Sequence, residues 1–269
     1  MGDPAAPLVD AHVHLFTAAL PLASNAWTVP EVELPVAAFE ELMARHGVTH
    51  GVVSAMSLLG DLNDYTISAL RRNPRLRGTV IVDPTSDRYL LERMREDGVV
   101  GIRFQWRRLA HLPDLADPDY RRLLYRVADL GWHVELNIER DRLPPVIDRL
   151  CRSGVDIVVD HFGDPCPDNG FANPGGQALL RALDTGRVRV KLSAGYRFPA
   201  TPAALAEFAA TLLARAGTER VFWGSDAPFV GTKHPTSYAE QLALLSRVVP
   251  DAEVRKQMSS AAHDFYFRH

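Results

Sequence analysis

Eight short runs of β-branched and apolar residues recur along the chain, and helix-like segments separate them. The strand-like runs cover residues 8–16, 49–56, 76–83, 99–106, 131–139, 156–163, 188–196 and 220–228. Strands that alternate with helices form parallel sheets, because each crossover helix returns the chain to the same end of the sheet. Eight such units in 269 residues predict an α/β fold, a (β/α)8 TIM barrel, rather than an open doubly wound sheet.

Three of the intervening segments carry clear helix boundaries. Residues 35–47 begin with Pro35, end at Gly47 and space their apolar residues three and four apart. Residues 117–131 and 202–217 also end at a glycine, as many helices do. Because strands and helices alternate throughout, the sequence predicts a single domain over residues 1–269.

Charge and cysteine content exclude several classes of function. The formal net charge is −3, and the chain has no basic or acidic block of the kind that binds nucleic acid. Cys151 and Cys166 lack the spacing of a metal site or of a disulfide framework. No apolar stretch reaches the ~18 residues of a membrane span. We therefore expect a cytoplasmic enzyme that acts on a small molecule, without a nucleic-acid or membrane partner; the sequence defines no subunit interface.

Polar residues occupy one face of the fourth and fifth strand-like runs. Arg103 and Gln105 alternate with apolar residues in the fourth run, as do Glu135 and Asn137 in the fifth. Side chains on a strand alternate between its two faces, so these residues point toward the barrel axis. We expect them to line the wet, ligand-binding end of the barrel. A buried ion-pair network that only fills the barrel is the alternative.

Two further charges are predicted to lie lower in the barrel. Asp10 precedes the first histidine pair, and Lys191 faces inward by parity on the seventh run. A charge inside a barrel needs a partner. We therefore expect Asp10 and Lys191 to form a structural ion pair.

Four side chains at strand ends could carry chemistry. His12 and His14 lie two residues apart near the end of the first run and so point the same way. His161 ends the sixth run and Asp226 the eighth, and barrel enzymes place their working groups at these ends. Three imidazoles and a carboxylate can hold a divalent cation or transfer protons directly. A His-x-His pair alone fits a structural role equally well, but the histidine and the aspartate at two other strand ends favour catalysis.

The motifs VDAHVHLF, GIRFQW, VVDHFG, VKLSAGYR and VFWGSDAP, in this order over nearly the whole chain, resemble the amidohydrolase superfamily. More narrowly, they resemble its amidohydrolase-related branch, which includes 2-pyrone-4,6-dicarboxylate lactonases and sugar lactonases. Binuclear members carry a carbamylated lysine on strand 4, where this chain has Arg103, and mononuclear members take a histidine from strand 5, which here ends in Asn137. The resemblance therefore implies either no metal or one divalent ion, with zinc as first choice. The ligands of such an ion would be His12, His14, His161 and Asp226.

A second group of candidates is basic. Arg103 and Arg107 follow strand 4 and Arg197 follows strand 7, where dicarboxylate lactonases similarly carry arginines that hold substrate carboxylates. The planar guanidinium suits this role because it pairs with a carboxylate through two hydrogen bonds. Together with Asn137, these arginines are the predicted substrate-binding residues. Surface ion pairing is the alternative, and we favour it for Arg108.

The chain also departs from the lactonase pattern. Asp164 stands where those lactonases have an arginine shortly after the strand-6 histidine, and Asp226 is followed by Ala-Pro-Phe instead of Trp-Pro-His. Lys233 and His234 follow a few residues later and could supply replacement contacts. These departures predict a shifted substrate preference.

The residues and the resemblance together predict hydrolysis of a lactone that carries a carboxylate or several hydroxyls. Ionised Asp226 would take a proton from water, and Arg103 and Arg197 would fix the substrate. His12, His14 and His161 would polarise the carbonyl as imidazolium groups or through a cation that they hold. Two alternatives are a mononuclear zinc-dependent decarboxylase of an aromatic or muconate-type acid and a non-catalytic ligand-binding barrel.

Overall fold

A nearly closed ring of parallel strands forms the centre of the molecule. The computed structural model describes residues 6–232 and 235–268, and within these ranges eight strands form one sheet in chain order. The strands are β1 (Val9–Val13), β2 (His50–Val53), β3 (Leu76–Val80), β4 (Val99–Gln105), β5 (His133–Asn137), β6 (Asp156–Val159), β7 (Val188–Leu192) and β8 (Val221–Trp223). A parallel bridge between Val13 and Ala227 joins the chain after β8 to β1. The predicted TIM barrel is confirmed.

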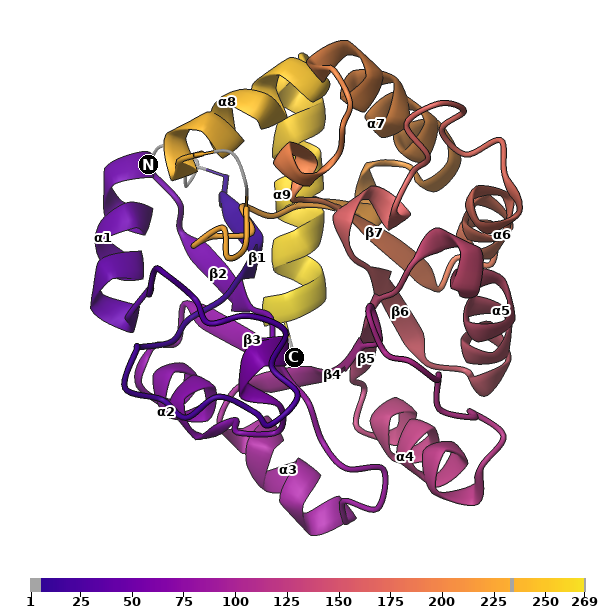
Figure 1. Ribbon diagram of the computed structural model, residues 1–269. Coiled ribbons are helices and arrows are strands. Elements are labelled where there is room, and N and C mark those ends of the chain that lie inside the picture. The colour runs from indigo at the N-terminus through magenta and orange to yellow at the C-terminus, as the bar shows by residue number, and fades with distance from the viewer. Residues whose placement is uncertain (1–5, 233–234, 269) are drawn as a thin grey trace.

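Helices surround the barrel (Figure 1). They are α1 (Val36–His46), α2 (Asp64–Arg72), α3 (Arg88–Glu96), α4 (Pro118–Asp129), α5 (Leu143–Ser153), α6 (Pro174–Leu183), α7 (Pro202–Ala216), α8 (Tyr238–Val248) and α9 (Ala252–Phe267). Helix α1 starts after Pro35 and stops at Gly47, whose φ of 69° is a conformation that glycine adopts readily. Among the described residues, no helix combines the length and apolar character needed to cross a membrane.

Strand β8 is shorter than the run 220–228 that predicted it. A Cβ atom on Gly224 would lie 2.4 Å from the Cβ of His12, so only glycine allows β8 to approach β1 this closely. Two residues later, Asp226 has a φ of 61° and turns the chain over the end of the barrel. The amide of Asp226 donates to the carbonyl of His12 at 2.8 Å, which fixes this turn against β1.

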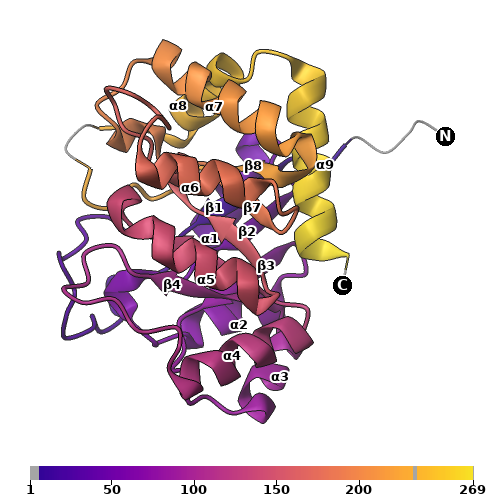
Figure 2. The ribbon, with the colours of Figure 1, turned by 90° about the vertical axis from the view of Figure 1, so that its right-hand side faces the viewer.

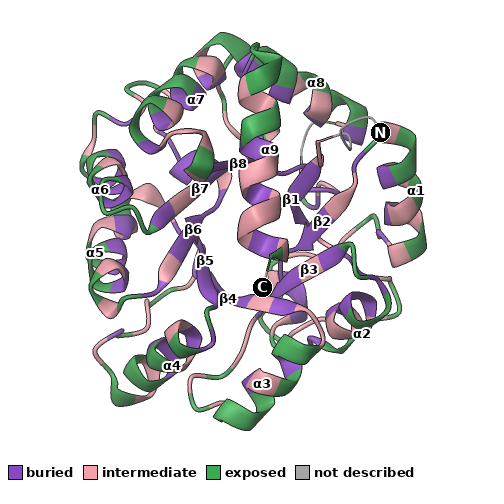
Figure 3. Ribbon diagram, turned by 180° about the vertical axis from the view of Figure 1, so that it is seen from behind, coloured by how far each residue is buried: buried purple, intermediate pink, exposed green. Residues whose placement is uncertain are grey.

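Helix α9 covers the end of the barrel opposite the long loops. Ala262 and Tyr266 pack against Val9 and Ala11 of β1 and Phe222 of β8. Seen from behind, α9 runs across the centre of the barrel (Figure 3), and the side view places it away from the loops that follow the strands (Figure 2). The C-terminal ends of the strands therefore form the end of the barrel that α9 leaves uncovered.

The lower interior of the barrel is filled by a buried ion-pair network of Arg103, Glu135, Asp160 and Lys191. The Nζ atom of Lys191 lies 2.8 Å from Glu135 and 3.4 Å from Asp160. The guanidinium of Arg103 lies 2.8 Å from Glu135 and 2.7 Å from Asp160. The alternative of a structural network thus describes Arg103 and Glu135. Gln105 and Asn137, at the ends of the same strands, line a cavity instead.

The predicted Asp10–Lys191 ion pair is wrong. Asp10 accepts hydrogen bonds from the amide of Ser225 at 2.9 Å and from the hydroxyl of Tyr238 at 2.8 Å. The Nζ atom of Lys191 instead lies close to Glu135 and Asp160, which supply two carboxylates. Strand parity correctly predicts which side chains point inward, but it does not determine which neighbour each one meets.

Candidate active site

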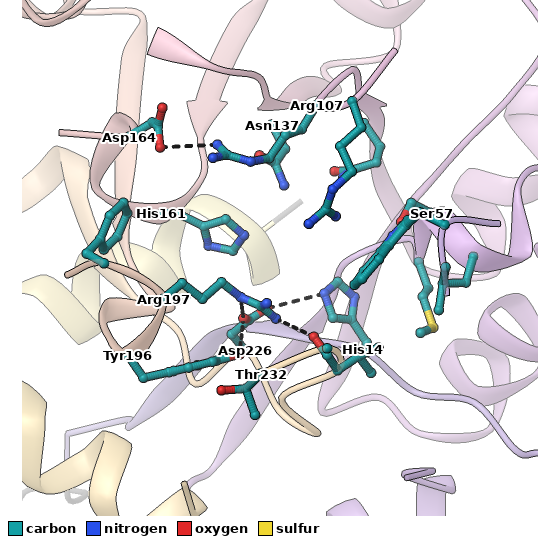
Figure 4. Close-up of a pocket in the computed structure, with 18 of the residues that line it drawn as sticks. His14, Ser57, Arg107, Asn137, His161, Asp164, Tyr196, Arg197, Asp226 and Thr232 are labelled. Carbon is teal, nitrogen blue, oxygen red and sulfur yellow. Dashed lines mark hydrogen bonds and ion pairs between the residues drawn. The ribbon is translucent and has the colours of Figure 1, made fainter. Parts of the chain in front are cut away.

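The histidines and the aspartate predicted at the strand ends meet at one place. The ring centroid of His12 lies 4.9 Å from that of His14 and 4.9 Å from that of His161. The Oδ1 atom of Asp226 lies 3.6 Å from Nε2 of His12 and 3.4 Å from Nε2 of His14. Figure 4 shows His14, His161 and Asp226 around the floor of a cavity. Strands β1, β6 and β8 therefore bring the four side chains together over the barrel axis.

Two of these residues have unusual backbone conformations. His161 and Asp226 have φ angles of 52° and 61°, in the left-handed region that non-glycine residues seldom occupy. Such conformations cost about 1–3 kcal/mol each and persist only where the surrounding structure holds them. Here they occur at the points where β6 and β8 end, and they direct both side chains across the mouth of the barrel.

Each imidazole is oriented through its Nδ1 atom. The Nδ1 of His14 lies 2.8 Å from the carbonyl of Ser54, and that of His161 lies 2.9 Å from the hydroxyl of Ser193. The Nδ1 of His12 lies 3.2 Å from Asp160. These contacts leave the Nε2 atoms for the cavity side. Nε2 of His12 is buried and has no hydrogen-bond partner among the described residues.

Burial and charge set the protonation of the cluster. Burial lowers the pKa of His12 to about 4, against the opposing charge of Asp160, and it lowers the pKa of His161 well below the usual value. Both rings are therefore neutral near pH 7, which does not support the predicted imidazolium form. Burial alone would raise the pKa of Asp226, but the positive charge of Arg197 and a hydrogen bond with His14 hold it well below its ordinary value. Asp226 is thus ionised.

Two side chains that follow β7 hold the other oxygen of Asp226. Tyr196 donates its hydroxyl to Oδ2 at 2.6 Å, and Arg197 donates Nε–H to the same atom at 2.9 Å. A second Arg197 nitrogen donates to the carbonyl of Val230 at 3.0 Å. Sequence reasoning identified Arg197 but missed Tyr196, although its position next to Arg197 after a barrel strand was a usable signal. Both contacts leave Oδ1 directed toward the histidines.

A cavity of about 540 Å³ opens above the cluster. Its walls include all four predicted substrate-binding residues, Arg103, Arg107, Asn137 and Arg197, of which Figure 4 labels the last three. Trp27 comes from the segment between β1 and α1, and Asp164 from the segment between β6 and α6. Within the described ranges, five arginines but only two aspartates line this space, so it is suited to anionic ligands; the arginines are Arg103, Arg107, Arg108, Arg140 and Arg197, and the aspartates are Asp164 and Asp226.

The arginines on and after β4 differ in their surroundings. Arg103 also borders the cavity, but its nitrogens face Glu135, Asp160 and the carbonyl of Ala55. Arg108, for which a surface ion pair was favoured, instead lies over the ring of Trp27, 4.0 Å from the ring centroid. Lys233 and His234 lie outside the described residues.

Two groups of side chains in the described part of the chain have the geometry to hold a metal ion. One consists of His12, His161 and Asp226, whose ligand atoms lie within 4.8 Å of one another. The other combines His12 with Glu135 and Asp160, where Lys191 and Arg103 already supply positive charge. Only the first group borders the cavity through His161 and Asp226. The first group therefore fits a catalytic ion better than the second.

The fold and the cluster define an enzyme of the barrel hydrolase class, with a carboxylate and imidazoles at the C-terminal ends of the strands. Residues 9–268 match the family model described as Amidohydrolase, and the chain belongs to this family.

Other proteins are similar to this chain in sequence, in fold or in both. A 4-sulfomuconolactone hydrolase from Hydrogenophaga intermedia is 24% identical over 257 residues, which cover 93% of this chain and 84% of the relative. A solved structure from Pseudomonas putida, assigned as a 2-pyrone-4,6-dicarboxylic acid hydrolase, is 31% identical with a TM-score of 0.90 and covers 97% of both chains. A zinc-containing amidohydrolase from Burkholderia multivorans shares the fold, at 19% identity and a TM-score of 0.80 over 98% of this chain and 99% of that one.

Proposed function

We propose that this protein is a lactonase that opens the ring of an anionic or polyhydroxylated lactone. The observation that carries the proposal is the ionised Asp226 carboxylate, which lies at the floor of an arginine-lined cavity with Oδ1 directed toward His12 and His14. Two relatives that span nearly the whole chain are named as hydrolases of a lactone and of a pyrone dicarboxylate. Both substrates are cyclic esters that carry acidic groups.

In this proposal, Asp226 is the general base. Oδ1 takes a proton from a water molecule whose oxygen attacks the lactone carbonyl, and the ring C–O bond then breaks. The leaving oxygen receives the proton from Asp226, so the products are a carboxylic acid and a hydroxyl or enol. A positioned base of this kind contributes typically ~10²–10⁴-fold to the rate.

Arginines would bind the acidic groups of the substrate. Arg197 lies beside Asp226, so an anionic group that it binds would bring the ring carbonyl close to the base. Arg107 and Asn137 stand on the wall formed by β4 and β5. Arg103 has its nitrogens directed at internal acceptors, so we assign it mainly the positioning of Asp160 beneath His12.

One zinc ion fits the cluster. Neutral imidazoles that bind a metal through Nε2 usually donate Nδ1–H to a second partner, and His12, His14 and His161 all have such partners. The lone pair of His14 Nε2 and an oxygen of Asp226, 3.4 Å apart, also need a proton or a cation between them. When bound to these residues, zinc would polarise the carbonyl and lower the pKa of a bound water to about 7.

The remaining expectations belong to the same proposal. We propose that the barrel acts as one domain over residues 1–269, takes a small-molecule acid as its substrate and works in the cytoplasm. The unpaired Cys151 and Cys166 support a reducing compartment.

The proposal is tested with a panel of lactones. Purified protein is mixed with 2-pyrone-4,6-dicarboxylate, 4-sulfomuconolactone and glucono-δ-lactone, and both acid release and carbon dioxide are recorded. Ring opening of at least one lactone with acid release and without gas is expected. Carbon dioxide from an aromatic acid, with no lactone opened, would instead support a decarboxylase.

Metal content is measured in parallel. Elemental analysis of the purified protein is expected to give about one zinc per chain. The variant His161→Asn should hold much less zinc, while His111→Asn, in an exposed loop, should hold as much as the unmodified protein. Equal zinc in both variants would place the ion elsewhere.

A further inference from the structure

Asp164 brings a negative charge into the outer wall of the cavity. Its side chain is only 11% exposed, and Oδ1 lies 3.1 Å from a terminal nitrogen of Arg107. The other oxygen, Oδ2, accepts the backbone N–H of Arg140 at 3.0 Å and lies 4.0 Å from a nitrogen of the Arg140 side chain. In Figure 4 a dashed line joins the carboxylate of Asp164 to a guanidinium in the cavity wall. One carboxylate thus engages two of the arginines that line this space.

The turn after β6 fixes the position of Asp164. Its backbone has φ and ψ of 56° and 58°, and its amide donates to the carbonyl of His161 at 2.9 Å. Aspartate and asparagine tolerate this left-handed conformation better than most residues. The carboxylate is therefore fixed at the rim by the same turn that places His161 in the site.

This charge limits what the outer cavity can bind. An arginine that already faces one carboxylate binds a second carboxylate more weakly, because the two anions repel each other across the shared cation. The positive charge of Arg107 is partly balanced by Asp164, and that of Arg197 by Asp226. The outer wall thus suits a neutral polar group better than a second carboxylate.

We propose that Asp164 is a specificity-determining residue that makes this site prefer singly charged lactones to dianionic ones. The substrate class in this statement rests on the proposed lactonase function. The charge selectivity itself depends only on the geometry around Asp164, so it can be measured without turnover.

Binding of two simple anions tests the selectivity. Calorimetric titration compares glutarate, a dianion, with butyrate, a monoanion of similar length, on the unmodified protein and on Asp164→Asn. Asparagine suits the backbone conformation and can still accept the Arg140 N–H, but it carries no charge. We expect glutarate to bind about tenfold more tightly to the variant, the order of one added charge-assisted hydrogen bond, and butyrate to change less than about twofold.

Three further variants sharpen the result. Asp168→Asn makes the same charge change in the same loop at a residue outside the cavity lining, and it should leave both affinities unchanged. Arg107→Gln added to Asp164→Asn should remove the gain for glutarate. Asp164→Ser serves as a second neutral variant should the asparagine variant fold poorly. Equal changes for both anions, or no change for glutarate, would overturn the proposal.

Turnover separates this inference from the proposed function. Asp164→Asn should shift the ratio of kcat/KM for 2-pyrone-4,6-dicarboxylate over 2-pyrone-6-carboxylate upward by about tenfold. An unchanged ratio with active enzyme would contradict the role of Asp164 alone. If the unmodified protein opens no lactone, the proposed function fails, and the binding titrations still decide the role of Asp164.

Discussion

The lower interior of the barrel and its mouth are both built from charged side chains, yet they differ in how the charges are paired. In the lower network, Arg103 and Lys191 each lie within 3.4 Å of both Glu135 and Asp160, and all four side chains are at most 2% exposed. At the mouth, the Nε2 atoms face a carboxylate oxygen beside an open cavity. Fully paired charges stabilise a structure, whereas converging groups whose lone pairs are not all used can bind and act on a ligand.

His12 connects the two regions. Its Nδ1 atom lies among Asp160, Lys191 and Ser54 of the lower barrel, while Nε2 faces Asp226 at the mouth. The network therefore orients His12, although His12 itself does not line the cavity. If this division is correct, variants of the mouth should change activity and variants of the network should change stability.

The largest effect on activity is expected for Asp226→Asn. The substitution keeps the shape of the side chain but removes the base, so kcat should fall by ~10²–10⁴-fold. The melting temperature should change little, because Asn can still accept hydrogen bonds from Tyr196 and Arg197. Steady-state kinetics and calorimetry measure the two quantities, with Asp141→Asn at an exposed position as the control. Turnover equal to that of the unmodified protein would remove Asp226 as the base.

The largest effect on stability is expected for Lys191→Met. Removing one partner of a buried network leaves uncompensated charge, and we expect the free energy of unfolding to fall by ~3–5 kcal/mol. Urea denaturation measures this change, and Lys256→Met on the exposed side of α9 controls for loss of a lysine. Unchanged stability would show that the network does not hold the barrel together and would break the contrast between the two regions.

A smaller loss of activity is expected for Tyr196→Phe. The hydroxyl donates to the ionised Asp226, and hydrogen bonds to charged groups contribute ~1.5–3 kcal/mol, so kcat/KM should fall by about tenfold or more. Tyr125→Phe, on the exposed surface of α4, is the matched control. A variant as active as the control would mean that Arg197 alone holds the carboxylate.

The last effect is small near neutral pH, grows in acid and concerns the pH dependence of stability. Burial lowers the pKa of His133 to about 3, so in the folded state this ring stays neutral at pH values where it is protonated in the unfolded chain. Stability is therefore lost as the pH falls from about 6.5 toward 3, by up to ~1.4 kcal/mol per pH unit for one group. His133→Gln should make the decline shallower across this window in urea titrations. A profile parallel to that of the unmodified protein would contradict a buried neutral ring.

Much of the fold could be predicted from the sequence, because strands and helices each space their apolar residues with a characteristic period. The His-x-His spacing also predicted two side chains on one face, and strand ends predicted that His161 and Asp226 would join them. The Asp10–Lys191 pair failed because parity does not specify lateral neighbours. Tyr196 was missed although it stands next to Arg197 after a barrel strand, because its hydrogen bond to Asp226 depends on the left-handed turn at Asp226, which strand and helix patterns do not predict.

The central claim is that His12, His14, His161 and Asp226 form the place where a lactone is opened. A crystal structure of Asp226→Asn soaked with a lactone that the unmodified protein hydrolyses tests it most directly. We predict an intact ring whose carbonyl carbon lies over the substituted side chain, with an acidic group on Arg197. An ordered lactone bound away from these residues, or with its carbonyl turned from them, would contradict the account.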